Sequence, residues 1–213
     1  YTLTYSATGL TDATQSISLA HGTATTLELI APSTADNSRT ISTNVVVRLK
    51  DIDGNLVTTG TPTVTLSISD ATISGTAVRN LASGEISFPG LKFVGLTGSK
   101  TLSATITSPV ALTTTTPVQL SFGDATKLVV TTQASGAVNR QLFTTQPAVT
   151  VQDVSGNPVT SFSGTINLSV SPADAVLSGT TSRVLSGSAV AYFDDLALNG
   201  KIGTYTLTFA SSD

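Results

Sequence analysis

Apolar and polar residues alternate along much of the chain. The alternation is clearest in six stretches: residues 27–29, 45–49, 64–68, 128–130, 149–151 and 166–170. A period of two places one face of a strand in a core and the other face in solvent. Thr and Val are frequent in the chain, and their branched side chains suit a pleated strand better than a helix. The pattern therefore predicts an all-β protein built from short strands.

These stretches belong to an internal repeat. LKDIDGNLV (Leu49–Val57) returns as VQDVSGNPV (Val151–Val159), and ATISGT (Ala71–Thr76) returns as AVLSGT (Ala175–Thr180). The period is about 100 residues, which is the size of an Ig-like sandwich. We therefore expect tandem Ig-like antiparallel β-sandwiches with Greek-key connections.

The two ends of the chain share a sequence, because it opens on YTLTYSATG and closes on YTLTFASSD. Residues 1–22 are predicted to be the last two strands of a preceding Ig-like unit, or a donor segment. Residues 23–123 are predicted to be a complete Ig-like domain. Residues 124–213 are predicted to be a second domain whose final strand is missing.

An incomplete sandwich exposes unpaired backbone groups along one edge. Residues 10–22 carry a strand of the missing type, and Gln15, Ile17 and Leu19 are the residues predicted to form the assembly strand. One molecule can lend such a strand to the next. Because donor and acceptor lie at opposite ends, the contact would propagate as an open fibre. The simpler interpretation, which the repeat favours over the fibre, is that the sequence is one stretch of a longer tandem array.

Composition narrows the classes of partner. Charged residues make up 11% of the chain, against about 25% in typical soluble domains. The net charge is −3, and the 10 Lys and Arg residues are not clustered, which argues against nucleic-acid binding. No apolar run is long enough for a membrane span. The absence of cysteine excludes disulfides and thiolate metal sites.

Motifs for catalysis are missing. His21 is the only histidine, and no glycine-flanked nucleophile elbow accompanies it. No phosphate-binding glycine motif follows a predicted strand. An enzyme would have to rely on carboxylates alone, and no pair of them has a spacing that places both in one cleft. We therefore expect no catalytic residues, no cofactor-binding residues and no enzymatic activity.

The stretch DIDGN is the one candidate metal site. Asp51, Asp53 and Asn55 offer oxygen ligands at alternate positions around a glycine, as at the start of a calcium loop. The distal Glu of an EF-hand loop is absent, and the matching stretch DVSGN has lost the second aspartate. The sequence favours a structural turn, with Ca²⁺ as the alternative occupant.

The second repeat carries a resemblance to a known family. The run ATKLVVTTQASGAVNRQLFTTQPAVTVQDVSGNPV, followed by LSGT and YTLTFASS, resembles the Ig-like repeats of large secreted bacterial surface proteins. The first repeat keeps D-x-D-G-N and I-S-G-T but lacks T-Q-P. The resemblance implies an extracellular or cell-surface bacterial protein that serves as a stalk, fibre or surface-layer component.

The leading hypothesis is therefore a structural module whose partners are copies of itself or neighbouring Ig-like repeats. The alternative is an adhesin module that recognises a glycan or a host protein through loops at the sandwich ends. Sugar rings are usually gripped by exposed aromatic faces, and the chain has no Trp, which weakens the glycan hypothesis.

Overall fold

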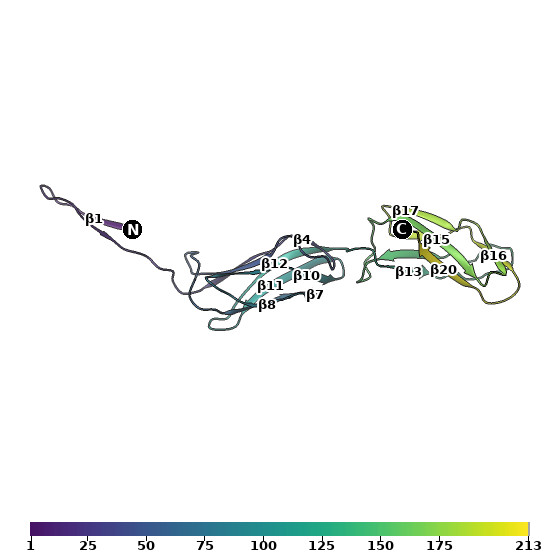
Figure 1. Ribbon diagram of the computed structural model, residues 1–213, viewed down its shortest axis with the longest axis horizontal. Helices are drawn as coiled ribbons and strands as arrows, with labels where there is room; N and C mark the ends of the chain where they lie inside the picture. Colours follow the sequence, from purple (N-terminus) through teal and green to yellow (C-terminus); the bar gives the residue numbers. More distant parts are fainter. Residues whose placement is uncertain (213) are drawn as a thin grey trace.

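The computed structural model describes residues 1–212, and these residues form twenty strands and no helix. The prediction of an all-β protein is thereby confirmed. Figure 1 shows the chain as three parts in a row, with a hairpin at one end followed by two larger β-structures. In the described part of the chain, no helix has the length and hydrophobicity needed to cross a membrane.

We call residues 1–22 the N-terminal segment, residues 23–123 the middle unit and residues 124–212 the C-terminal unit. The N-terminal segment forms a hairpin of β1 (Thr2–Tyr5) and β2 (Ala13–Ser16). The strands of the middle unit are β3 (Thr26–Ile30), β4 (Thr34–Asp36), β5 (Val45–Lys50), β6 (Thr63–Ile68), β7 (Ala71–Ser74), β8 (Val78–Asn80), β9 (Glu85–Phe88), β10 (Lys92–Gly95), β11 (Gly98–Ile106) and β12 (Leu112–Ser121). The strands of the C-terminal unit are β13 (Lys127–Thr132), β14 (Ala148–Gln152), β15 (Ser163–Ser171), β16 (Ala175–Ser178), β17 (Ser182–Ser186), β18 (Val190–Tyr192), β19 (Ala197–Gly200) and β20 (Thr206–Ser211).

The middle unit contains a three-stranded sheet, ordered β3-β5-β9, and a five-stranded sheet, ordered β4-β12-β11-β6-β8, together with the pair β7-β10. Along β5, Val45, Val47 and Leu49 are buried, while Val46 and Arg48 between them are partly exposed. Side chains from both sheets join one hydrophobic cluster. This arrangement is consistent with a β-sandwich, as the alternating pattern predicts.

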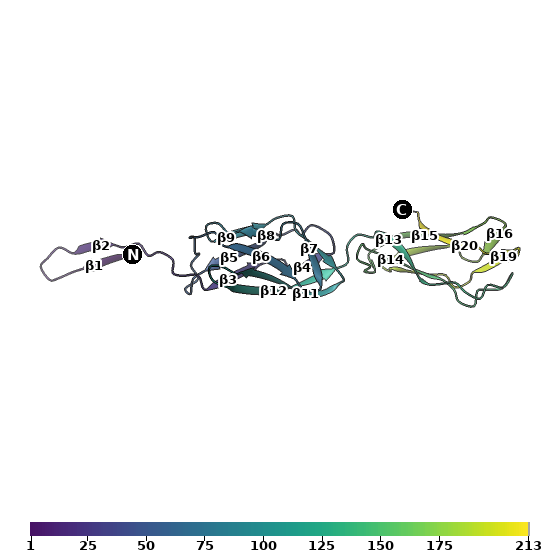
Figure 2. The same ribbon diagram turned by 90° about the horizontal axis from the view of Figure 1, so that it is seen from below.

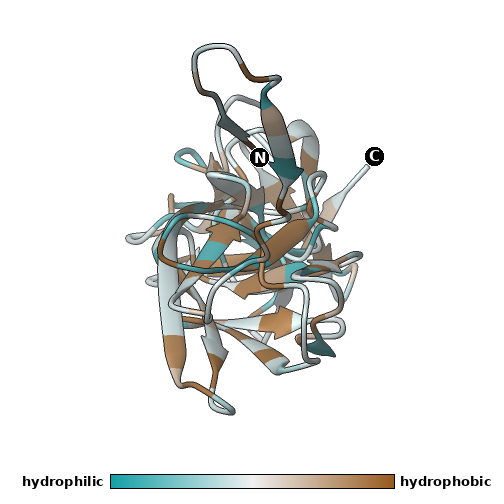
Figure 3. Ribbon diagram, turned by 90° about the vertical axis from the view of Figure 1, so that its left-hand side faces the viewer, coloured by the Kyte–Doolittle hydropathy of each residue, from teal (hydrophilic) through white to brown (hydrophobic). Residues whose placement is uncertain are grey.

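The C-terminal unit repeats most of this architecture. Its sheets are ordered β13-β14-β18 and β17-β15-β20, with the pair β16-β19. Figure 2 labels β13, β14, β15, β16, β19 and β20 in this unit. The pairing of Leu27 with Leu49 in the middle unit returns as the pairing of Leu128 with Val151. Seen from the hairpin end, apolar and polar stretches alternate along the strands (Figure 3).

The two units differ at one edge. In the middle unit β11 lies between β12 and β6, whereas its counterpart β20 pairs only with β15. Within residues 1–212, no strand covers the other edge of β20, and the parallel partner of β12, the short strand β4, has no counterpart either. The five-stranded sheet of the middle unit is therefore a three-stranded sheet in the C-terminal unit.

The N-terminal hairpin has the register of the last two strands of the middle unit. Leu3 pairs with Gln15 in β1-β2, and Leu102 pairs with Thr116 in β11-β12. Every residue of β1 and β2 is exposed, because no second sheet packs on the hairpin. The hairpin therefore has the pairing of a unit's final strands without the core that such strands normally cover.

The predicted assembly strand is only partly a strand. Gln15 lies in β2, but β2 ends at Ser16, so Ile17 and Leu19 follow it. Ile17 still exchanges two backbone hydrogen bonds with Tyr1, which precedes β1. The residues after Ile17 have no partner in β1, whose residues pair only with Ala13–Ser16. The role of the three residues in assembly stays a prediction.

The two hydrophobic clusters share no residue. One side chain crosses the predicted boundary after Gly123, because Phe122 packs against the cluster of the C-terminal unit. The division into segments 1–22, 23–123 and 124–213 stays a prediction, and residue 213 lies outside the described residues.

Candidate assembly sites

A buried aspartate lies where the middle unit meets the C-terminal unit. Asp153 follows β14 and caps the turn after it: its Oδ1 accepts hydrogen bonds from the backbone N–H groups of Ser155, at 3.0 Å, and Asn157, at 2.9 Å. Its Oδ2 accepts from Asn157 Nδ2 and from the N–H of Gly123, both at 2.9 Å. Asp favours such turns because its short side chain reaches the backbone just ahead of it.

Two asparagines connect this turn to the middle unit. Asn37 Nδ2 donates to Asp153 Oδ2 over 2.7 Å, and Asn37 Oδ1 accepts from the N–H of Gly95 at 2.9 Å. From the other side, Asn157 Nδ2 donates to the carbonyl of Gly95 at 3.0 Å, and Asn157 Oδ1 accepts from the N–H of Thr97 at 2.8 Å. We call this set of contacts the joint.

The joint excludes solvent from its polar groups. Asn37, Asp153 and Asn157 are 1%, 0% and 2% exposed. Burial by itself would raise the pKa of Asp153, but the hydrogen bonds from Gly123, Asn157 and Asn37 outweigh it and hold that pKa below its ordinary value. A buried carboxylate is tolerable only when its oxygens are satisfied in this way.

Close packing at the joint requires a glycine. A Cβ on Gly123 would lie 2.1 Å from the backbone carbonyl oxygen of Asn37, closer than any real contact. Outside this buried set, Arg39 Nε donates to Asp124 Oδ1 at 3.1 Å, but both side chains are exposed. Exposed ion pairs contribute little to stability, so the buried amides and carboxylate dominate the joint.

The candidate calcium residues form the same kind of turn in the middle unit. Asp51 Oδ1 accepts from the N–H groups of Asp53 and Asn55, at 3.1 and 2.8 Å. Its Oδ2 accepts from the N–H of Gly22 at 2.7 Å and from Asn55 Nδ2 at 3.1 Å. These bonds, that from Gly22 foremost, lower the pKa of Asp51 to about 2.

The four bonds to Asp51 account for the roughly four lone-pair directions of a carboxylate. Asp53, the second candidate ligand, has an exposed side chain. In residues 1–212 no group of three or more His, Cys, Asp or Glu residues is placed to share a metal ion. The contacts describe a structural turn, and calcium binding stays a prediction.

A groove of about 420 Å³ runs beside the uncovered edge of β20, and both apolar and polar groups line it. Its apolar walls come from Val130, Phe143, Leu198, Leu207 and Phe209. The ring of Phe209 also packs on Phe193, with the ring centroids 5.5 Å apart. Leu207 and Phe209 remain partly exposed here, because no strand within residues 1–212 closes over them.

The middle unit shows what fills this position when a strand is present. There β12 pairs with β11, and Val118 and Leu120 of β12 are both 0% exposed. Ile17 and Leu19 precede Gly22 by the same spacing at which Val118 and Leu120 precede Gly123. Ile17 is 48% exposed and Leu19 is 78% exposed, so the N-terminal segment carries the matching side chains without a core to bury them.

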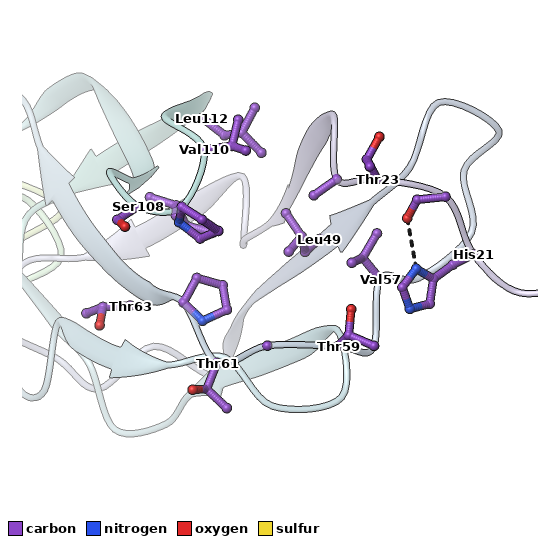
Figure 4. A pocket seen from close by; sticks show the side chains of 16 residues that line it. His21, Thr23, Leu49, Val57, Thr59, Thr61, Thr63, Ser108, Val110 and Leu112 are labelled. Atoms are coloured by element: carbon purple, nitrogen blue, oxygen red, sulfur yellow. Dashed lines mark hydrogen bonds between the residues drawn. The ribbon is translucent and has the colours of Figure 1, made fainter.

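A second hollow, of about 880 Å³, opens at the end of the middle unit nearest the N-terminal segment (Figure 4). Leu49, Val57 and Leu112 line it, and His21 stands at its rim with Nδ1 donating to the carbonyl of Gly22 at 2.8 Å. The residue that precedes the matching glycine, Gly123, is Phe122, which is partly buried and packs against the hydrophobic cluster of the C-terminal unit. His21 therefore stands where the other glycine is preceded by a partly buried aromatic residue.

The sequence pattern does not single out Asn37 of the joint. Asn37 precedes Asp51 by the same spacing at which Asn139 precedes Asp153. Because the residues between them differ in the two units, this equal spacing is the only sequence feature that marks Asn37. The spacing does not reveal the partner of Asn37, because Asp153 is far away in the sequence.

Comparisons with known proteins give no family for the chain. No protein-family model matches it, and no curated protein matches it. A β-glycosidase from Bacteroides vulgatus is similar in structure, with 13% identity and a TM-score of 0.38, over 88% of this chain and 23% of that one. A β-glucuronidase from Parabacteroides merdae has 9% identity and a TM-score of 0.30, over 90% of this chain and 25% of that one. The chain thus spans about a quarter of the length of these structures, and likenesses this distant do not establish what it does.

Proposed function

We propose that the chain is a structural module of an extracellular or cell-surface bacterial protein. Its two larger parts are Ig-like Greek-key sandwiches of about 100 residues that stack end to end. Copies join head to tail, with the segment around β2 of one copy lying in the groove beside β20 of the next. The observation that carries the proposal is the match between Ile17 and Leu19 and the fully buried Val118 and Leu120.

The register of the hairpin supports strand donation. Since β1-β2 and β11-β12 share a register, β2 can pair with β20 as β12 pairs with β11. The β20 strand of the acceptor would then replace the donor's own β1 as the neighbour of β2. The exchange keeps the backbone hydrogen bonds of β2 and adds burial for Ile17 and Leu19. Main-chain pairing supplies affinity in such contacts, and the pockets for alternate side chains supply specificity.

The energetic gain comes mainly from apolar surface. Leu207 and Phe209 on the acceptor and Ile17 and Leu19 on the donor are all incompletely buried in the single chain. Fully burying one large apolar side chain contributes about 1.5–3 kcal/mol. Four such side chains in one groove favour a stable contact.

The buried joint supports a load-carrying or spacing role. Flexible linkers between domains are usually polar and solvated. Here the connection at Gly123 is enclosed by hydrogen bonds to Asp153 and Asn37. A connection of this kind holds successive units in a fixed orientation, which suits a stalk or fibre.

Assembly state tests the proposal. The purified chain should form regularly beaded fibres in negative-stain images, and hot detergent should return them to single chains. The double variant Ile17→Asp, Leu19→Asp should remain monomeric by light scattering, because two carboxylates would lose their hydration against the side chains of Phe143, Leu207 and Phe209. Leu10→Asp is the control, since Leu10 is about as exposed as Leu19 but lies in the hairpin loop, outside β2 and the residues that follow it. Fibres that persist in the double variant would overturn strand donation.

The hollow beside His21 favours the second candidate function, recognition of a glycan or host protein. It lies at one end of the middle unit and is bordered by loops that include residues 59–62 and 108–110. Retention of the wild-type chain on a glycan array or on host-cell protein, lost on His21→Phe, would support it. Equal retention of both proteins would place recognition elsewhere.

A further inference from the structure

The residues of the joint have counterparts elsewhere in the chain. Asp51 and Asn55 match Asp153 and Asn157, and Asn139 and Gly200 match Asn37 and Gly95. We propose that the turn of Asp51 and Asn55 in one copy binds Asn139 and Gly200 at the far end of another copy. This clasp would reproduce between molecules the hydrogen bonds that connect the middle and C-terminal units. It rests on the proposed head-to-tail assembly and names the polar contact that orients it.

The receiving half is already formed at the far end of the C-terminal unit. Gly200 N–H donates to Asn139 Oδ1 at 3.1 Å, as Gly95 N–H donates to Asn37 Oδ1 at 2.9 Å. The residue after each asparagine also makes the matching backbone bond: Ser38 to the carbonyl of Phe93, and Arg140 to that of Leu198. Asn139 thus has the orientation that Asn37 has in the joint.

Asn37 and Asn139 differ in whether the side-chain nitrogen Nδ2 donates a hydrogen bond. Asn37 Nδ2 donates to Asp153 and is buried, whereas Asn139 is exposed and its Nδ2 has no hydrogen-bond partner within residues 1–212. Ile202 occupies the position of Thr97, whose N–H donates to Asn157. The far end therefore presents two donors, Asn139 Nδ2 and the backbone N–H of Ile202. The side-chain oxygens of an Asp and an Asn from another unit could accept hydrogen bonds from them.

The other half, the turn of Asp51 and Asn55, is formed at the end of the middle unit that adjoins the N-terminal segment. Asp51 accepts from Gly22 and from both nitrogens of Asn55, as Asp153 accepts from Gly123 and Asn157. Asn55 is nevertheless exposed, and its Oδ1 accepts no hydrogen bond from any described residue.

A glycine marks the same contact. Gly123 must be glycine because the Asn37 carbonyl presses against it, whereas a Cβ on Gly22 would meet nothing closer than Asp51 Oδ2 at 3.4 Å. Among residues 1–212 of the single chain, no contact therefore demands glycine at position 22. The requirement arises once the backbone of Asn139 from another copy takes the place that Asn37 takes beside Gly123.

Two contacts of the interior joint do not carry over. Ser155, whose Oγ donates to Asn37 Oδ1 at 3.2 Å, is replaced by Asp53, and Asp124, the partner of Arg39, is replaced by Thr23. The clasp between copies therefore has fewer contacts than the interior joint. We expect it to be the weaker of the two and to open first.

Strand donation brings the two halves together. In the middle unit β12 ends at Ser121, and Gly123 then enters the joint beside Asp153. A donated strand in the groove of the C-terminal unit would end at the same level and place the donor's Gly22 and Asp51 beside Asn139. One binding event thus fills the groove and closes the clasp.

The test uses the full chain with Asn139→Asp, which keeps the acceptor for Gly200 but faces Asp51 with a second carboxylate. Asn44→Asp adds the same charge at another exposed asparagine and is the control. Losing a charge-assisted hydrogen bond and gaining a like-charge contact should weaken assembly roughly tenfold or more, measured by light scattering on dilution. Surviving fibres should bend more in negative-stain images. Gly22→Ala should act in the same direction without lowering the thermal stability of the monomer.

The outcomes separate the clasp from strand donation. If Asn139→Asp and Gly22→Ala assemble with wild-type affinity and stiffness while Ile17→Asp, Leu19→Asp stays monomeric, the clasp is wrong and strand donation stands. If the Ile17 and Leu19 variant still assembles and Asn139→Asp does not, the clasp stands and strand donation is wrong. A wild-type chain that remains monomeric at its highest soluble concentration overturns both.

Discussion

Asn37 Nδ2 donates to Asp153 Oδ2 over 2.7 Å, and the two residues are 116 positions apart in the chain. Both are buried, although each sits at the end of its own unit. A hydrogen bond to a charged group contributes about 1.5–3 kcal/mol when it is shielded from water. This contact therefore couples the two units.

Removing the carboxylate should destabilise the C-terminal unit. In Asp153→Ala the donors of Gly123, Asn37 and Asn157 lose their common acceptor, and each buried donor left unsatisfied costs about 1–3 kcal/mol. We expect a fall of about 3 kcal/mol or more in the free energy of unfolding, measured by urea denaturation. Asp12→Ala, at an exposed loop position, should change stability by less than about 0.5 kcal/mol. Equal effects of the two substitutions would show that Asp153 does not stabilise the fold.

Substitution of the joint glycine should loosen the orientation of the units. In Gly123→Ala the new Cβ collides with the Asn37 carbonyl, so the backbone must shift and the hydrogen bonds around Asp153 must lengthen. Small-angle X-ray scattering should show a broader distribution of intramolecular distances than for the wild type. Ser121→Ala, two residues earlier in β12, is the control. An unchanged scattering profile would contradict the close packing at Gly123.

Acid should weaken the turn of the middle unit in a defined pH range. The pKa of Asp51 is lowered to about 2 in the folded chain, against about 3.9 in an unfolded one. A lowered folded-state pKa gives stability that is fully present above about pH 4 and is lost as the pH falls toward 2. Thermal unfolding between pH 5 and pH 2 should show this loss, and Asp51→Asn should reduce it. A pH profile identical in the two proteins would contradict the assignment.

Calcium is expected to have little effect on the same turn. The oxygens of Asp51 already accept four hydrogen bonds, so an ion would have to displace the donors of Gly22 or Asn55. Millimolar Ca²⁺ should leave the melting temperature within about 1 °C of its value in EDTA, since a ligand that does not bind the folded state does not stabilise it. A rise that vanishes in Asp53→Asn would instead establish the calcium site.

The sequence predicted the strands better than the contacts between units. The alternation around Val45, Val47 and Leu49 was visible because burial repeats every second residue within one strand. The partial repeat of the final strands at residues 1–22 was also visible, and its pairing register matches that of β11-β12. Both features are local in the chain, and local patterns can be recognised without knowing what packs against them.

The joint could not be predicted in the same way. The D-x-x-G-N stretch at Asp51 predicts a turn or a calcium loop, because its local chemistry fits either. Its counterpart at Asp153 shows that the same turn also accepts an amide from the neighbouring unit. That partner, Asn37, lies on a segment whose spacing to Asp153 depends on the whole fold. Long-range contacts of this kind carry no local periodicity.

The hollow at the end of the middle unit leads to a last prediction. His21 precedes Gly22 as Phe122 precedes Gly123. Phe122 packs, partly buried, against the cluster of the C-terminal unit, while His21 lies at the rim of a space of about 880 Å³. In His21→Phe the ring can turn inward onto Leu49 and Val57, which line that space. Burying a phenyl ring contributes about 1.5–3 kcal/mol at full burial, and partial burial should raise the free energy of unfolding by about 1 kcal/mol. His21→Ala controls for loss of the imidazole, and a phenylalanine variant no more stable than the alanine variant would show that the hollow does not accept the ring.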